Sequence, residues 1–336
     1  MRAFDPSPRA CGPLATLVLI ALMLPGCGGA PTAPPSSRSS ENALRAGLAG
    51  TDRPPAAQGG GAFYPLEVGN RWAYDHSLGL YFVPVGGPPG PVFGVNDHQG
   101  RELVCVEQRG GHGYFVEQQS FENPSLLTWT RFRQDGDGLF EADVASNEPP
   151  ACSGATGRRV FDTGASAARS EAAWSAIAAR IDPARQAACR AAFDRVQARA
   201  SAIRAALGVL SRSPVLTPGI TGVDAGEITR LAYPLHPGAS WVIRSSPRFE
   251  STVEGRDALA LASSRVPGWR IRIDSEFNGP DDHVHVWYGR DGFLRLEDHL
   301  EGIATDPNGV LIGRMVLDES LVLTEVSLNG GRFAAH

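Results

Sequence analysis

Runs of alternating apolar and polar residues begin near Phe63 and recur through most of the chain. Alternation with a period of two, rich in β-branched and aromatic side chains, is typical of strands that bury one face. The first half contains five such runs, at residues 72–80, 102–108, 113–121, 127–133 and 138–144. The second half contains six, at residues 240–245, 250–260, 269–277, 283–289, 293–300 and 314–326. No helical pattern separates neighbouring runs within either half, so the pattern predicts antiparallel sheets.

Two Asp-Gly pairs stand between neighbouring runs and predict tight hairpins. Asp137-Gly138 lies between the last two runs of the first half, and Asp291-Gly292 lies between two runs of the second half. A type I′ turn needs a positive φ at both central positions, which Asp and Gly tolerate. We therefore expect a hairpin with Asp and Gly at its centre in each half.

The segment between the two halves has a helical period instead. Trp174 and Ile177 lie on one face of an Ala-rich stretch, and Asp182-Pro183 then supplies an N-cap and a first-turn proline. Apolar residues follow in alternating steps of four and three, at Cys189, Phe193, Val196, Ala200, Ile203, Leu207 and Leu210. The pattern predicts two antiparallel helices joined near Asp182. We expect the apolar stripe to pack on the sister helix or on a sheet; a cofactor or partner site there is the alternative.

An internal repeat links the two halves. Residues 63–74 read FYPLEVGNRWAY, and residues 232–243 read AYPLHPGASWVI. Tyr, Pro, Leu, Gly and Trp keep the same spacing at an offset of 169 residues. Residues 128–141 and 286–297 repeat a second pattern, in which an aromatic strand meets an Asp-Gly turn. Two matches in the same order predict a duplicated β unit.

The second copy of the first motif departs from the first at two positions. Ala239 stands where the first copy has Asn70, and Ile243 stands where it has Tyr74. If those positions make a specific contact, only the first unit keeps it.

The motif Phe63-Tyr-Pro-Leu-x-x-Gly-Asn-x-Trp-x-Tyr74 resembles the opening of a group of uncharacterised bacterial secreted and lipid-anchored proteins. The resemblance implies a strongly curved antiparallel sheet, similar to the half-barrels of the outer-membrane lipoprotein carrier and receptor family. Trp287-Tyr288 followed by Asp291-Gly292 matches the end of the same pattern. The expected fold is therefore mainly β: two duplicated, half-barrel-like antiparallel sheets with an inserted α-helical hairpin.

The N-terminus has the pattern of an export signal. Arg2 and Arg9 precede an apolar run at residues 14–24, which is too short for a permanent membrane span. Leu24-Pro25-Gly26-Cys27 resembles the bacterial lipobox, in which the cysteine receives acyl chains, palmitate among them, before cleavage. We predict a lipid-anchored protein with Cys27 as the lipidation site; a signal peptide cut elsewhere is the alternative. Gly28 is not the aspartate that favours inner-membrane retention, so we expect the outer membrane, on its periplasmic face or at the cell surface.

These patterns divide the chain into five parts. Residues 1–26 are the expected signal peptide, and residues 27–62 are the lipidated cysteine and a linker too poor in large apolar residues to fold. The first β unit is expected at 63–150, the helical hairpin at 151–212 and the second β unit at 213–336.

Composition narrows the partners. The 336 residues are 42% hydrophobic and 20% charged, as in ordinary globular proteins. A net charge of −5 gives no basic field for nucleic acid. We therefore expect no nucleic-acid partner. The expected partners are the membrane, through the lipid, and either an apolar ligand or another envelope protein.

Three cysteines remain after export and lipidation: Cys105, Cys152 and Cys189. Cys152 and Cys189 both belong to the central segment and are candidates for a disulfide in an oxidising compartment. Three buried thiols are the alternative.

Aromatic residues of the repeated motifs are the candidate ligand-binding residues. They are Trp72, Tyr74, Trp241, Trp287 and Tyr288. For Trp72 and Trp241 we favour packing in the core over stacking on a ligand.

One segment has the composition of a metal site. Asp281 and Asp282 precede His283 and His285, which share one face of a predicted strand. The simpler interpretation is a polar turn that opens a strand with a polar outer face. No motif of a hydrolase, metalloprotease or nucleotide-binding enzyme occurs in the sequence, and no cofactor is expected.

The sequence therefore favours a non-enzymatic binding or scaffolding module anchored in the cell envelope. A curved sheet whose apolar inner face is open to solvent would support a lipid or acyl ligand, and a face filled by its own helix would count against one. The alternative is a metal-dependent hydrolase using Asp281 to His285, which requires a further ligand nearby.

Overall fold

The computed structural model of the chain describes residues 63–90, 92–121, 126–146, 150, 152, 163–207, 227–261, 264–328 and 331–334. All of them belong to one compact unit, Pro54–His336. The predicted signal peptide, Cys27 and the linker lie outside the described residues.

The first half contributes six strands, each paired antiparallel with the next along the chain. They are β1 (Arg71–Pro84), β2 (Phe93–Arg109), β3 (His112–Phe121), β4 (Leu126–Gln134), β5 (Gly138–Ser146) and β6 (Ile228–Ala232). Five of the six match predicted runs. β6 follows the helices and was not predicted.

The second half contributes seven strands. They are β7 (Ser240–Ser245), β8 (Arg248–Leu261), β9 (Ser264–Ser275), β10 (His283–Gly289), β11 (Gly292–Thr305), β12 (Leu311–Leu328) and β13 (Gly331–Ala334). β7 to β12 match the predicted runs, and the four-residue β13 is an addition that pairs with β12. The prediction of antiparallel pairing is confirmed throughout.

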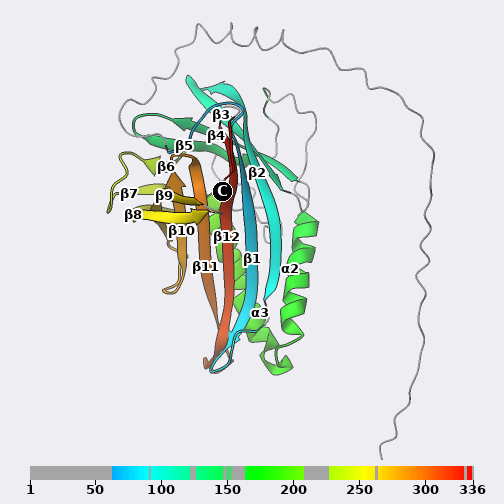
Figure 1. Cartoon of the computed structure of the whole chain (residues 1–336). Helices are drawn as coiled ribbons and strands as arrows, with labels where there is room; N and C mark the ends of the chain where they lie inside the picture. Colours follow the sequence, from blue (N-terminus) through cyan, green and yellow to red (C-terminus); the bar gives the residue numbers. More distant parts are fainter. Residues whose placement is uncertain are drawn as a thin grey trace, which may run out of the picture. The chain divides into compact units, whose positions relative to one another are not determined.

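The two halves form one continuous sheet because the first strand pairs with the twelfth (Figure 1). The strand order is β6-β5-β4-β3-β2-β1-β12-β11-β10-β9-β8-β7. The two end strands approach each other, and Trp241 Nε1 on β7 donates to the carbonyl oxygen of Thr229 on β6 at 3.1 Å. The sheet is therefore a nearly closed, barrel-like sheet with an inner and an outer face.

The hairpins form where predicted, but the turn chemistry differs. Gly292 has a φ of +108°, yet it follows the turn residues Arg290 and Asp291 instead of standing between them. Gly138 has no positive φ; it is required because an added Cβ would clash with the carbonyl oxygen of Leu231 on β6. The close approach of a neighbouring strand therefore explains this glycine.

The central segment forms the two predicted helices, α2 (Thr163–Ala178) and α3 (Pro183–Leu207). Asp182 caps α3, since its Oδ1 accepts the backbone N–H of Ala184 at 3.0 Å. Among the described residues, no helix has the length and apolar character to cross a membrane.

The apolar stripe of α3 packs against the inner face of the sheet. Its buried members are Cys189, Phe193, Val196, Ala200 and Ile203. At Gly302 on β11, an added Cβ would lie only 2.5 Å from Val196 Cγ2 and 2.7 Å from the Ala192 carbonyl oxygen. The helix thus occupies the inner face beside β11, as the prediction of a packed stripe required.

The disulfide prediction was wrong. Cys152 is bonded to Cys105 on β2, with Cα atoms 6.0 Å apart, and Cys189 is a free, buried thiol. The reason is the direction of the α3 stripe: Cys189 faces the core among apolar side chains, out of reach of Cys152.

The two copies of the repeated motif make the same backbone hydrogen bonds. Gly69 N donates to Leu103 O at 2.7 Å, and Leu103 N donates to Asn70 O at 3.0 Å. In the second copy, Gly238 N donates to Val253 O and Val253 N donates to Ala239 O, both at 2.8 Å. Each glycine has a positive φ, +94° and +83°. The motif therefore anchors the chain to the second strand of its own half in both places.

Candidate functional site

The inner face holds a buried polar cluster where the halves meet. Glu117 on β3 is fully buried and accepts hydrogen bonds from the Tyr64 hydroxyl and from Gln119 Nε2, the latter at 3.0 Å. The Arg101 guanidinium lies over the Tyr74 ring, 4.7 Å from its centroid. Burial raises the pKa of Glu117, and the nearby positive charge of Arg101 opposes that rise. The polar side chains here fill the space that an apolar ligand would require.

A second buried ion pair joins the last strands of the first half. Arg230 on β6 donates through Nε to Glu141 on β5, and both side chains are at most 5% exposed. Burial raises the pKa of Glu141 to about 7, although the Arg230 charge favours the ionised form. The pair is buried on the inner face of the sheet.

Three of the candidate ligand-binding aromatics are buried and make their contacts inside the core. Trp72 is buried and donates through Nε1 to the Asp291 carbonyl oxygen at 2.6 Å. Tyr74 is buried and donates to the Phe293 carbonyl oxygen at 3.1 Å. Tyr288 packs edge-on against Phe293 at 5.5 Å. Trp72 and Tyr74 therefore join β1 to the β10–β11 hairpin, and Tyr288 packs within that hairpin.

Trp241 and Trp287 lie elsewhere. Trp241 is partly buried and bridges β7 to β6, as described above. Trp287 is 4% exposed and donates through Nε1 to Asp257 Oδ2 at 3.0 Å. The five aromatics are thus not gathered in one place.

The candidate metal ligands are also dispersed. Asp282 accepts hydrogen bonds from the backbone N–H groups of Gly279 and Glu301 and pairs with Arg199 at 2.6 Å, so its carboxylate is fully engaged in holding α3 to the sheet. Asp281 is exposed, and His285 faces Glu254, with Nε2 3.2 Å from Oε2. No group of three or more potential ligands with metal-binding geometry occurs in the described part of the chain.

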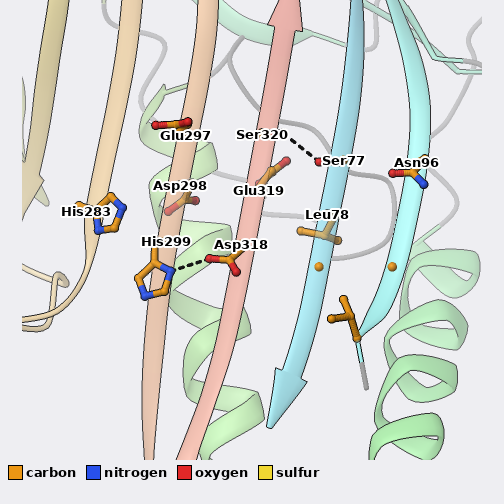
Figure 2. A pocket seen from close by; sticks show the side chains of 13 residues that line it. Ser77, Leu78, Asn96, His283, Glu297, Asp298, His299, Asp318, Glu319 and Ser320 are labelled. Carbon is orange, nitrogen blue, oxygen red and sulfur yellow. Dashed lines mark hydrogen bonds and ion pairs between the residues drawn. The ribbon is translucent and has the colours of Figure 1, made fainter. Parts of the chain in front are cut away.

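The outer face of the sheet carries an open hollow of about 540 Å³ (Figure 2). It spans five neighbouring strands, whose registers place its residues in two rows. One row is Asn96, Ser77, Ser320 and Glu297. The next row is Gly94, Gly79, Asp318, His299 and His283.

Small residues on β1 and β2 make the floor. Gly79 and Gly94 are cross-strand partners, and Ser77 beside them hydrogen-bonds to Ser320 on β12 through their hydroxyls at 2.8 Å. A Cβ at Gly94 would touch nothing closer than the Leu78 carbonyl oxygen at 3.8 Å. The floor is low because the two glycines carry no side chains.

Histidines and carboxylates make the opposite wall. His299 Nδ1 lies 2.5 Å from Asp318 Oδ1, and the Tyr81 hydroxyl donates to Asp318 Oδ2 at 2.8 Å. The His283 ring stacks on His299 at a centroid distance of 4.9 Å. Figure 2 shows His283, His299 and Asp318 on the neighbouring strands β10, β11 and β12.

The wall has a defined ionisation pattern. The hydrogen bond to Asp318 raises the pKa of His299, and the same contact lowers the pKa of Asp318. Burial, followed by the hydrogen bond to Asp318, raises the pKa of Tyr81 to about 12. The wall therefore offers a carboxylate, an imidazole and a phenol held in place by one another, suited to binding polar groups.

Sequence reasoning identified His283 and missed the rest of the hollow. Its residues lie on five strands, two from the first half of the chain and three from the second. The signal that was available is the pair of strand glycines, Gly79 and Gly94, since a glycine inside a strand often marks a place where something approaches the backbone closely.

Comparison with known proteins adds little to the geometry. No protein-family model matches the sequence, and no curated protein matches it. Two solved structures align with 80% of this chain and the whole of their own. One is a candidate lipoprotein from Parabacteroides distasonis ATCC 8503, 12% identical with a TM-score of 0.33. The other is a candidate exported protein with a YmcC-like fold from Bacteroides fragilis NCTC 9343, 10% identical with a TM-score of 0.29. Similarity at this level does not assign the chain to a family.

Proposed function

We propose that this chain is a lipid-anchored, non-enzymatic protein of the bacterial outer membrane that docks a partner protein on the outer face of its sheet. The observation that carries the proposal is the contrast between the two faces. The inner face is occupied by α3 and by the buried cluster around Glu117. The outer face keeps an open hollow of about 540 Å³.

The filled inner face counts against an apolar ligand. A lipid carrier needs a continuous apolar space, and burying ionised groups beside an acyl chain would be costly. Val196 and Ala192 of α3 lie against Gly302 where such a space would begin. A partner protein is therefore the better occupant, and it would meet a polar surface with charged and hydroxyl groups.

The anchoring part of the proposal is carried by Leu24-Pro25-Gly26-Cys27. Intact mass spectrometry of the protein extracted from membranes tests it. A mature chain that begins at Cys27 and carries acyl mass is the expected result, and Cys27→Ser is expected to abolish both the cleavage and the added mass. An unmodified cysteine in the wild-type protein would refute the anchor.

Photo-crosslinking in cells tests the docking surface. A photoreactive amino acid is placed at Asn96, beside the hollow, and at Arg272, an exposed outer-face position on β9. A crosslinked partner is expected from Asn96 alone.

A matched pair of variants makes that test specific. Gly94→Phe fills the hollow, whereas Gly94→Ala adds one carbon that has only an ordinary contact. The crosslink should survive Gly94→Ala and be lost with Gly94→Phe. Equal crosslinking from Asn96 and Arg272, or a crosslink indifferent to Gly94→Phe, would refute docking in the hollow.

The two β units also support an origin by duplication, which we propose on the matching hydrogen bonds of the two motifs. The departures have a physical meaning. Asn70 Nδ2 donates to the Pro65 carbonyl oxygen at 2.7 Å, and the Tyr74 hydroxyl reaches Phe293. Ala239 and Ile243 carry no polar side-chain group, so these two contacts belong to the first unit.

A further inference from the structure

The exposed apolar side chains gather at one end of the sheet. Five of the nine large apolar residues that are exposed in the described part of the chain lie in or beside the β1–β2 and β11–β12 connections. They are Val85, Val92, Ile303, Val310 and Leu311, and we call them the apolar tip. Val85 and Val310 are each 60% exposed.

The two connections are held side by side. Pro84 at the end of β1 is the register partner of Gly313 on β12, and Val85 N donates to the Ile312 carbonyl oxygen at 3.2 Å. The carboxylate of Asp306 accepts the backbone N–H groups of Asn308 and Val310, both at 2.8 Å, which fixes the shape of the β11–β12 turn. The apolar tip is therefore a preformed surface.

The turn between the helices places two arginines at the same end. A small pocket of about 190 Å³ lies between this turn and the β1–β2 connection, and Phe82, Pro88 and Ile181 line its apolar part. Arg180 and Arg185 line its rim and are exposed. Asp182 lies between them in the sequence, and its carboxylate accepts the N-cap hydrogen bond of α3.

We propose that the apolar tip contacts a lipid bilayer, with its valine and leucine side chains in the interface and Arg180 and Arg185 on anionic phosphate headgroups. Apolar groups on protruding turns beside arginines have the chemistry of an interfacial membrane contact. A protein partner of matching shape is less suited to these convex turns.

The linker between Cys27 and the sheet is long enough to allow this contact. The proposal rests on the lipid anchor proposed above. The described chain enters beside the β10–β11 turn, where Trp72 contacts Asp291, and β1 then runs from there to the apolar tip. The 14 residues of β1 cover about 45 Å. Residues 27–62 can extend to about 120 Å, so an anchor at Cys27 allows the far end of the sheet to turn back to the same membrane.

Site-directed spin labelling of the mature, lipidated protein tests the proposal. Cys105 and Cys152 are joined and Cys189 is buried, so a nitroxide reports on an introduced cysteine alone. Labels are placed by Val310→Cys and Val85→Cys, and by Val242→Cys on β7 as an exposed control outside the apolar tip. The protein is reconstituted in vesicles of phosphatidylethanolamine and phosphatidylglycerol.

We expect collisions with a water-soluble nickel complex to fall on the order of tenfold, and collisions with oxygen to rise, at Val310 and Val85 but not at Val242. The double variant Arg180→Ala, Arg185→Ala should weaken this protection. The same protection in vesicles of phosphatidylcholine alone would overturn the role of the two arginines.

Acylated protein whose Val310 label stays as open to water as the Val242 label would overturn the membrane contact alone. A chain without acyl mass on Cys27 would overturn the anchor and, with it, the inference from the length of the linker. Protection of Val310 that persists in detergent micelles and grows with protein concentration would replace the bilayer with a second copy of the chain.

Discussion

At the scale of one residue, Glu141 shows that a carboxylate buried on the inner face of this sheet is only partly compensated for the loss of water. Its carboxylate is buried, and its Oε1 has no hydrogen-bond partner among the described residues, while Oε2 accepts from Arg230. A carboxylate without its full set of hydrogen bonds is poorly compensated for the loss of water. This explains why its pKa rises to about 7 despite the adjacent guanidinium.

The raised pKa of Glu141 makes stability depend on pH. The folded state binds this proton more tightly than the unfolded state, whose value is near 4.5. The contribution is therefore fully present below pH 4.5 and is lost as the pH rises to about 7, by about 3 kcal/mol at most. Denaturant unfolding of wild type and Glu141→Gln between these two pH values measures this contribution to the free energy of unfolding.

We expect the variant to lose less stability than wild type between those two pH values. Glu250→Gln, which alters a partly exposed carboxyl on β8, is the matched control and should follow wild type. Parallel stability curves for wild type and Glu141→Gln would contradict the assignment. Glu117, whose pKa is also raised by burial, is expected to supply the slope that remains.

The cysteines permit a second test at the residue scale. Peptide mapping without reduction should recover Cys105 joined to Cys152, and Cys189 should resist alkylation until the protein is unfolded. Burial raises the pKa of Cys189 to about 11, which leaves little thiolate to react at neutral pH. The disulfide closes a 47-residue separation, so removing it by Cys105→Ala should lower the free energy of unfolding by about 4 kcal/mol. Rapid alkylation of Cys189 in the folded protein would contradict this placement.

At the scale of elements, Gly302 sets how closely α3 approaches β11. Gly302→Ala places a methyl group 2.5 Å from Val196 and 2.7 Å from the helix backbone at Ala192, so helix or strand must shift. We expect a loss of about 1–3 kcal/mol in the free energy of unfolding. Gly255→Ala on β8 meets nothing within 4 Å and should be nearly neutral. Equal melting temperatures for the two variants would contradict close packing of the helix.

Most strands and both helices were predictable from the sequence because their signals are local. β7 to β12 and β1 to β5 alternate long enough to be recognised, and Asp182-Pro183 marks the start of α3. β6, with five residues, and β13, with four, are too short to show a period. The pairing of Cys105 with Cys152 depends on where the chain folds back, which no local pattern encodes.

The inner face was harder to predict than the strands themselves. Alternation assigns polar residues to solvent, yet Arg101, Glu117 and Gln119 point inward and are buried. Their partners come from other strands, so each looks like an ordinary outer-face residue in the sequence. The hollow was hidden for a related reason: Gly79 and Asp318 become neighbours only when β1 pairs with β12.

At the scale of the whole molecule, that pairing decides whether the two halves are separate. The register of β1 with β12 runs from Arg71 opposite Ser327 to Pro84 opposite Gly313, and α3, between the halves in sequence, packs on β11. Without this pairing, β1 and β12 would each be an unpaired edge strand of its own half. We therefore expect one cooperative unfolding transition, with equal calorimetric and van't Hoff enthalpies.

Two core substitutions test this unity from opposite halves. Leu80 on β1 and Leu300 on β11 are both buried to 1% exposure or less. Leu80→Ala and Leu300→Ala should each lower the single transition, by about 2–5 kcal/mol, because each leaves a cavity in the same core. Two resolved transitions, of which Leu80→Ala moves one and Leu300→Ala the other, would contradict a shared core. That result would mean that each half unfolds independently and that the β1–β12 pairing contributes little to the stability of either half.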